Sequence, residues 1–203
     1  MNPRRDPQPI GQFARRPFRA NPLVASEAPA LQAFFDENPD YFLAVNGELP
    51  RPCEAQEEFD DLPPADMSFS ERWLIGFTDP AGKLVGFAGV LSDILAARVW
   101  HIGIFIVASS LHGTGAASAL YDTLERWMAA NGAAWIRLGV VEGNVKAERF
   151  WRKMGYHEVR KRLGIAMGSR TNDVRVLVKP LDSRSIAEYL SLVERDNPDS
   201  EKT

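Results

Sequence analysis

The residues at positions 112–117, His-Gly-Thr-Gly-Ala-Ala, form the segment of this chain best suited to binding an anion. They follow an apolar, β-rich run at 99–107 and precede a helical pattern with Leu120, Leu124 and Trp127 on one face. The first N–H groups of a helix lack partners within the helix, and the helix dipole favours negative charge there. Glycines let a phosphate approach the backbone. The spacing predicts a phosphate site, although a Gly-x-Gly turn can also serve only to bend the chain.

A second segment, residues 144–156, carries polar and aromatic side chains at a defined spacing. Together the two segments resemble the GCN5-related N-acetyltransferase (GNAT) family. The family's Gln/Arg-x-x-Gly-x-Gly/Ala signature falls on His112, Gly115 and Ala117. Its downstream Asn-x-x-Ala-x-x-(Leu/Phe)-Tyr-x-x-x-Gly-Phe pattern falls on Asn144, Ala147, Phe150, Trp151, Gly155 and Tyr156. The order of elements agrees with the family from about residue 17 to residue 180.

The resemblance implies acetyl-CoA as cosubstrate and no metal. In the family the turn amides hold the pyrophosphate, here those of His112, Gly113, Thr114, Gly115, Ala116 and Ala117. The backbone of Ile106 and Val107 would pair with pantetheine like an added strand, and Phe150 joins the cofactor-binding set. Asn144 would contact the cofactor arm, cap the helix that follows, or do both. His112 departs from the family's Gln or Arg, and a neutral imidazole offers a single donor.

Acetyl transfer to an amine requires a neutral nucleophile and a donor for the charge that develops on the carbonyl oxygen. His101 falls where catalytic glutamates of the family often lie, and an imidazole suits a general base, although it could simply fill the strand face. Glu142, at the end of the next strand, is a second candidate base. In a regular strand His101, Gly103, Phe105 and Val107 share one side. We then expect His101 to deprotonate near pH ~6–7.

The family's tyrosine, which protonates the departing thiolate, falls on Trp151, whose indole N–H is a donor only. Trp151 is expected to pack on the cofactor or to be an ordinary core aromatic. Tyr121 or Tyr156 would then supply the proton, or the thiolate leaves unassisted. An acceptor pocket could use further aromatic residues, which near strands are more often core: Tyr41, Phe42, Trp73 and Trp100.

The remaining pattern predicts an α/β (α+β) fold. The resemblance implies a mixed, mostly antiparallel sheet with helices on both faces and a splayed central parallel strand pair. Residues 1–16 are predicted to be a flexible arm, 17–182 the acetyltransferase domain, and 183–203 a C-terminal helix with a polar tail from Asp196. An edge strand is expected at 18–24, since Pro22 suits no central strand.

Composition narrows the class of protein. The chain has 203 residues, of which 45% are hydrophobic and 25% charged, as in one soluble domain. A formal net charge of −3 argues against a nucleic-acid partner. We expect no membrane span and no secretory signal. The single cysteine, Cys53, fits a reducing cytoplasm. The expected partner is an amine of a small molecule or peptide; a homodimer is allowed but not required.

Three functions compete. The favoured one is N-acetyltransferase: acetyl transfer from acetyl-CoA to a primary amine by direct attack in a ternary complex. Loss of the family's tyrosine would also suit a non-catalytic acyl-CoA-binding regulator. Finally, Gly113-x-Gly115-x-x-Ser118 approximates the turn of a dinucleotide-dependent oxidoreductase, but its third glycine is missing and it follows a long meander.

Overall fold

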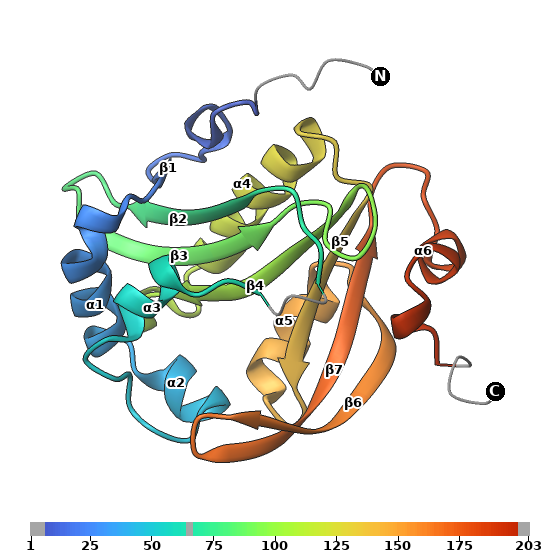
Figure 1. Cartoon of the computed structure of the whole chain (residues 1–203). Helices are drawn as coiled ribbons and strands as arrows, with labels where there is room; N and C mark the ends of the chain where they lie inside the picture. Colours follow the sequence, from blue (N-terminus) through green and yellow to red (C-terminus); the bar gives the residue numbers. More distant parts are fainter. Residues whose placement is uncertain (1–6, 64–66, 199–203) are drawn as a thin grey trace.

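A computed structural model of the chain describes residues 7–63 and 67–198 (Figure 1). Its centre is a seven-stranded sheet in the order β1-β2-β3-β4-β5-β7-β6. The strands are β1 (Arg19–Pro22), β2 (Arg72–Thr78), β3 (Leu84–Leu91), β4 (Val99–Val107), β5 (Trp135–Val141), β6 (His157–Met167) and β7 (Arg170–Pro180). Every neighbouring pair is antiparallel except β4 and β5. The predicted mixed sheet is confirmed, and it differs from the doubly wound parallel sheet that binds dinucleotides.

Helices cover both faces of this sheet. They are α1 (Ala28–Glu37), α2 (Asp40–Val45), α3 (Glu54–Asp60), α4 (Ala116–Ala130), α5 (Val145–Lys153) and α6 (Ile186–Leu192). Short 3-10 helices occupy Ile10–Phe13, Ala25–Glu27, Ser109–Leu111 and Glu194–Asp196. No helix among the described residues has the length and apolar character needed to cross a bilayer.

The parallel strands β4 and β5 separate soon after they begin. They pair only where Val99–Ile102 faces Trp135–Leu138, although both strands continue further. Figure 1 shows β4 continuing toward the left of the view while β5 runs downward. The predicted splayed pair is therefore present, and its opening lies at the ends of the two strands.

Gly103 is an extra residue in β4, because the register between β3 and β4 shifts at this point. A bulge of this kind reverses the side-chain alternation beyond it. His101, before the bulge, faces the side of the sheet that carries α3 and α6. Phe105, after it, faces α4 and α5, where it contacts Trp151 at 5.7 Å between ring centroids. The prediction that His101, Gly103, Phe105 and Val107 share one side is wrong because it assumed a regular strand.

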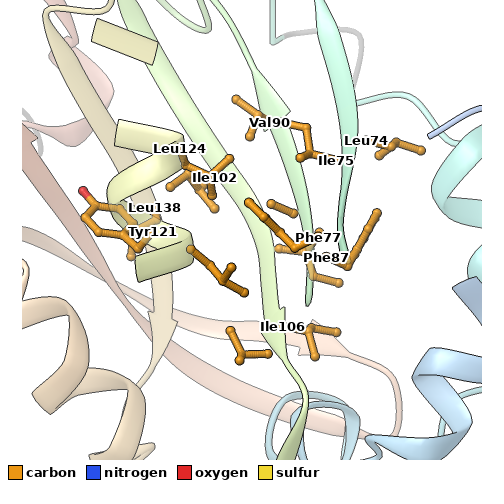
Figure 2. Packing of buried hydrophobic residues seen from close by; sticks show 14 of the residues in the cluster. Leu74, Ile75, Phe77, Phe87, Val90, Ile102, Ile106, Tyr121, Leu124 and Leu138 are labelled. Atoms are coloured by element: carbon orange, nitrogen blue, oxygen red, sulfur yellow. The ribbon is translucent and has the colours of Figure 1, made fainter. Parts of the chain in front are cut away.

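The core under α4 packs that helix against β2, β3, β4 and β5 (Figure 2). Leu120 and Leu124 are buried against the sheet, as their helical spacing predicted. Trp73 and Trp100 stack at 5.1 Å, and Trp127 of α4 meets both rings edge-on at 5.1 and 5.4 Å. Trp73 and Trp100 are therefore core residues and not part of an acceptor pocket.

The N-terminal segment packs on α4. Ile10 is 2% exposed, and the Trp127 indole N–H donates to the Gln8 carbonyl at 2.8 Å. The predicted flexible arm is thus wrong for residues 7–16, because one isolated apolar side chain finds a buried site. Residues 1–6 lie outside the described part of the chain.

The C-terminal segment holds a buried ion pair where a polar tail was predicted. Asp196 is fully buried, and its carboxylate accepts hydrogen bonds from Arg137 at 2.6 and 3.1 Å. Arg162 donates to the same carboxylate at 3.1 Å, and the Tyr189 hydroxyl donates at 2.5 Å. The segment after α6 is therefore held against β5 by the ion pair between Asp196 and Arg137. Residues 199–203 lie outside the described part.

Candidate active site

The turn between β4 and α4 has the backbone geometry of an anion site. Gly113 and Gly115 adopt left-handed φ values of 79° and 89°, and a Cβ added to either would meet open space. Gly115 is the N-cap of α4 without a side-chain cap. Within the described residues, the amides of Gly113, Gly115, Ala117 and Ser118 have no hydrogen-bond partner in the chain. These free donors at a helix N-terminus fit a phosphate group.

Three of the amides expected to bind pyrophosphate are used within the turn itself, and one of them, the Ala116 amide, donates to the Thr114 hydroxyl oxygen at 3.3 Å. The His112 amide donates to the Ser109 carbonyl at 3.1 Å, and the Thr114 amide donates to the Leu111 carbonyl at 3.3 Å. The Thr114 hydroxyl donates to the same Leu111 carbonyl at 2.7 Å. His112 and Thr114 therefore shape the turn, and the amides left for an anion are those of Gly113, Gly115, Ala117 and Ser118.

The His112 side chain connects the turn to the end of β4 through a hydrogen bond. Its Nε2 lies 3.0 Å from the Val107 carbonyl and its Nδ1 lies 2.6 Å from the Lys146 ammonium. The Nε2–H thus donates to the carbonyl, and Nδ1 accepts from Lys146, which selects one neutral tautomer. As a result, Lys146 of α5 places a cation beside the turn.

The backbone of Val107 faces the gap between β4 and β5, and that of Ile106 does not. The Ala108 amide donates to β3 at 2.9 Å, so by the alternation of an antiparallel ladder the next residue bonded to β3 is Ile106. The Val107 carbonyl points the other way, where His112 reaches it. The expected pairing of pantetheine with Ile106 is therefore corrected: the strand positions that face the gap are Phe105 and Val107.

A cavity of about 630 Å³ passes through the splay from one face of the sheet to the other. On the α5 side its wall includes Asn144, Ala147 and Trp151. On the opposite side it is lined by α2 and α3, including Tyr41, Phe42, Glu54 and Glu58. The β6–β7 hairpin closes one edge, where the Ser169 amide donates to the Asn46 carbonyl at 2.9 Å. Two of the four aromatic candidates, Tyr41 and Phe42, thus do line a pocket.

His101 lies on the cavity wall at the closed end of the splay. Its Nδ1 is 3.0 Å from the Arg137 carbonyl, so Nδ1–H donates there and Nε2 keeps its lone pair. Burial, with a further contribution from the Arg137 guanidinium, lowers the pKa of His101 to about 3. The imidazole is neutral at physiological pH but weakly basic. The deprotonation expected for His101 near pH ~6–7 is therefore not supported.

Glu142 is separate from this cavity. Both of its carboxylate oxygens lie 2.7 Å from the Lys161 ammonium, and Arg175 forms a further ion pair with it. It belongs to a partly exposed charge network on β6 and β7. The structure thus places His101 on the cavity wall and leaves Glu142, the other candidate base, outside the cavity.

Glu58 of α3 lines the cavity and was not among the site residues predicted from the sequence. Its Oε2 lies over β3, 3.9 Å from the position of a Cβ added to Gly89. Burial raises the pKa of Glu58 to about 7, although the Arg72 guanidinium at 3.7 Å lowers it. The sequence of α3 is rich in acidic residues, and the helical spacing of Ala55 and Phe59 indicates which of its carboxylates faces inward.

Trp151 is a core aromatic, which was one of the two roles expected for it, and its packing on a cofactor stays a prediction. It is 7% exposed, and its ring lies 5.3 Å from Tyr121 and 5.2 Å from Tyr156 by ring centroids. It also forms part of the cavity wall. The Tyr121 hydroxyl donates to the Tyr156 hydroxyl at 3.1 Å, burial raises the pKa of both, and neither lines the cavity. These tyrosines are not placed to protonate a thiolate in the cavity.

The remaining predicted cofactor residues lie on α5. The Asn144 side chain accepts from the Ala147 amide at 3.2 Å, which confirms it as the N-cap, and Asn144 also lines the cavity. Phe150 stacks on Phe105 at 6.1 Å beside the splay. No group of three or more His, Cys, Asp and Glu placed to hold a metal ion occurs in residues 7–63 and 67–198.

Comparisons with known proteins agree with this arrangement. The model of the acetyltransferase (GNAT) family matches residues 31–156. An acetyltransferase from Thermus thermophilus is 20% identical with a TM-score of 0.62, covering 81% of this chain and 97% of that chain. A spermidine N-acetyltransferase from Vibrio cholerae, solved with CoA and spermine, is 17% identical with a TM-score of 0.62, covering 82% and 96%.

A third solved structure, the ribosomal-protein-S18-alanine N-acetyltransferase from Escherichia coli, is 15% identical with a TM-score of 0.58, covering 83% of this chain and 97% of that chain. At these identities the likeness shows the fold. No curated protein matches the sequence significantly.

Proposed function

This chain belongs to the acetyltransferase (GNAT) family, and on that premise we propose that it transfers an acetyl group from acetyl-CoA to a primary amine of a small molecule or peptide. The amine attacks the thioester directly while both substrates are bound. One observation carries this proposal: a single cavity runs through the splay, with free helix N-terminal amides beyond one end and a carboxylate-lined wall at the other.

The cofactor side fits acetyl-CoA on the chain's own groups. The free amides of Gly113, Gly115 and Ala117 would bind the pyrophosphate, and Lys146 would add a positive charge. The strand edge at Phe105 and Val107 would pair with the pantetheine amides. Trp151 would form the apolar wall beside the arm. Acetyl-CoA supplies the activated acyl group.

Two observations, one on similar structures and one on the cavity of this chain, support an amine acceptor. The solved structures similar to this chain include a spermidine N-acetyltransferase and a ribosomal-protein-S18-alanine N-acetyltransferase. The opposite side of the cavity carries Glu54, Glu58 and Asp61, which suit a cationic ligand. The proposed substrate class includes the amine of a small molecule and the amine of a peptide.

This chain has Trp151 at the position where the family usually has the tyrosine that acts as general acid. An indole cannot donate its proton to a thiolate at physiological pH, so the departing sulfur must take a proton from the attacking nitrogen or from water. The same substitution is what favours the second candidate function, a non-catalytic acyl-CoA-binding regulator.

A thiol-release assay with acetyl-CoA against small amines, antibiotics and peptides tests the proposal, with calorimetry of acetyl-CoA binding run in parallel. We expect saturable binding and amine-dependent release of CoA. Binding without release for every amine would favour the regulator. Absence of binding would contradict both functions.

A further inference from the structure

Glu58 occupies the acceptor side of the splay beside the irregular part of β4. Its carboxylate lies over Gly89 of β3, and Gly89 pairs with Ile104, the residue after the bulge. Gly103 in the bulge is exposed and presents no side chain. The Ile104 Cγ2 and Leu74 Cδ2 atoms lie 2.9 and 3.8 Å from a Cβ added to Gly89, so the Glu58 carboxylate reaches this part of the cavity wall beside the Ile104 side chain.

The Glu58 carboxylate is poorly satisfied by the protein. Among the described residues it accepts no hydrogen bond, and its one ionic partner is Arg72 at 3.7 Å. Arg72 directs its N–H groups to the main chain instead: Nη1 donates to the Phe59 carbonyl at 3.4 Å, and Nη2 donates to the Glu58 carbonyl. A carboxylate that lines a cavity and lacks donors is suited to accept one from a ligand.

We propose that Glu58 is the catalytic residue that receives the proton of the attacking amine, so that the acceptor side of the cavity takes a protonated primary amine. This inference rests on the proposed function and deepens it. It replaces His101, whose Nδ1–H is committed to the Arg137 carbonyl and whose imidazole is a weak base.

The proton balance of the step is simple. The bound ammonium gives one proton to Glu58, and the neutral nitrogen then forms the C–N bond to the thioester carbonyl. As the C–S bond breaks, the thiolate takes a second proton from that nitrogen. Glu58 later releases its proton to solvent. One ammonium and one thioester thus yield an amide, a thiol and one proton.

The charged surroundings of Glu58 favour this role at neutral pH. Arg72 of β2 stabilises the carboxylate, whereas Glu54, Asp61 and Glu57 oppose its charge. Tyr41 of α2 lies partly buried beside these acids, with its pKa raised by burial first and by Glu58 and Glu54 second, and stays neutral. Across the cavity lie His101 and the cations Arg137 and Arg162, both paired with Asp196.

The pH profile follows from these groups. Burial raises the pKa of Glu58 to about 7. Below that pH the carboxyl group is protonated and cannot accept a proton; above it, the group is ready. We therefore expect kcat/KM for the amine to rise with pH and level off above about 7. Primary amines with a pKa near ~10 stay protonated across this range. The rise of kcat/KM with pH therefore reflects the ionisation of a group on the enzyme and not of the amine.

The test compares Glu58→Gln with Glu57→Gln on the same helix, using full-length protein and an amine found in the thiol-release assay. Glu57 is a matched control because it pairs with Arg51 and does not line the cavity. We expect Glu58→Gln to lower kcat by about 10²–10⁴-fold, to leave KM for acetyl-CoA unchanged, and to remove the pH limb. Glu57→Gln should stay within about twofold of wild type.

Glu58→Asp keeps a carboxylate, so it should retain part of the rate together with a pH limb; thermal melts check that all three variants are folded. Glu58→Gln with a near-wild-type rate and an unchanged limb would overturn the role of Glu58 while leaving the proposed function intact. A wild-type chain that binds acetyl-CoA but acetylates no amine would overturn both.

Discussion

The glycine turn at 112–117, proposed to bind phosphate, and the cavity wall of α2 and α3, proposed as the acceptor wall, are built by the chain in different ways. The turn is contiguous, and its donors are backbone amides set by Gly113 and Gly115. The acceptor wall gathers side chains from α2, α3 and β4 and is supported from behind by Asp196 near the C-terminus. One end therefore depends on local backbone conformation, and the other depends on packing across the whole fold.

This contrast predicts the largest loss of stability at Asp196. Asp196→Ala leaves the Arg137 guanidinium buried without its partner, which should lower the free energy of unfolding by about 3–5 kcal/mol in chemical denaturation. Asp122→Ala is the matched control, since Asp122 pairs with two arginines at the surface, and its effect should be far smaller. Equal losses from the two changes would contradict the idea that the acceptor end depends on this buried pair.

The same pair should make the protein acid-sensitive. Burial alone would raise the pKa of Asp196, but hydrogen bonds from Arg137 and Tyr189 outweigh it, and the pKa lies below the usual aspartate range. Such a group contributes stability above the pKa of the unfolded chain, about 3.9, and this contribution is lost as the pH falls through the folded-state pKa. Unfolding measured between pH 7 and pH 2 should show this decline in the wild type and a shallower one in Asp196→Ala.

The next largest effect is expected at the turn, on binding and not on stability. Gly115→Glu places a negative side chain where the pyrophosphate would lie, and we expect affinity for acetyl-CoA to fall by about 100-fold, or about 2.8 kcal/mol. Gly132→Glu is matched at the other end of α4: it has a φ of 98° and open space around it, against 89° at Gly115. If calorimetry finds the two folded variants equally weakened, the turn is not the anion site.

The smallest expected effect is that of Trp151→Phe on kcat. Trp151 lines the cavity that lies between the turn and the acceptor wall. Trp151→Phe keeps an aromatic ring against Phe105 and Tyr121 and removes only a donor that plays no acid role, so kcat should stay within about threefold of wild type. Initial rates at saturating acetyl-CoA measure this. A large drop in kcat with unchanged cofactor affinity would show that the indole takes part in the chemistry.

The difference between the two ends also explains what the sequence could predict. Helix periodicity, the glycine turn and the Asn144 cap are local, and the splayed sheet followed from the order of elements and the family resemblance. The bulge at Gly103 could not be predicted from the sequence because it depends on how β4 pairs with β3. As a result of the bulge, Phe105 lies on the opposite face of the sheet from His101. Asp196 looked like part of a polar tail because its partner Arg137 is distant in the chain.

The position of Glu58 could be predicted only in part from the sequence. Periodicity can show which face of a short helix is buried, but only the fold shows that this face borders a cavity. The homodimer and the cytoplasmic location inferred from the sequence stay predictions.

The most direct test of the central claim is a single-turnover experiment with acetyl-CoA labelled in its acetyl group, wild-type protein in excess and an amine substrate. Direct attack in a ternary complex predicts that the label moves to the amine nitrogen with equal release of CoA, and that mass spectrometry finds no labelled protein at any time. Label that passes first to the protein, or that leaves acetyl-CoA without reaching any amine, would contradict the account.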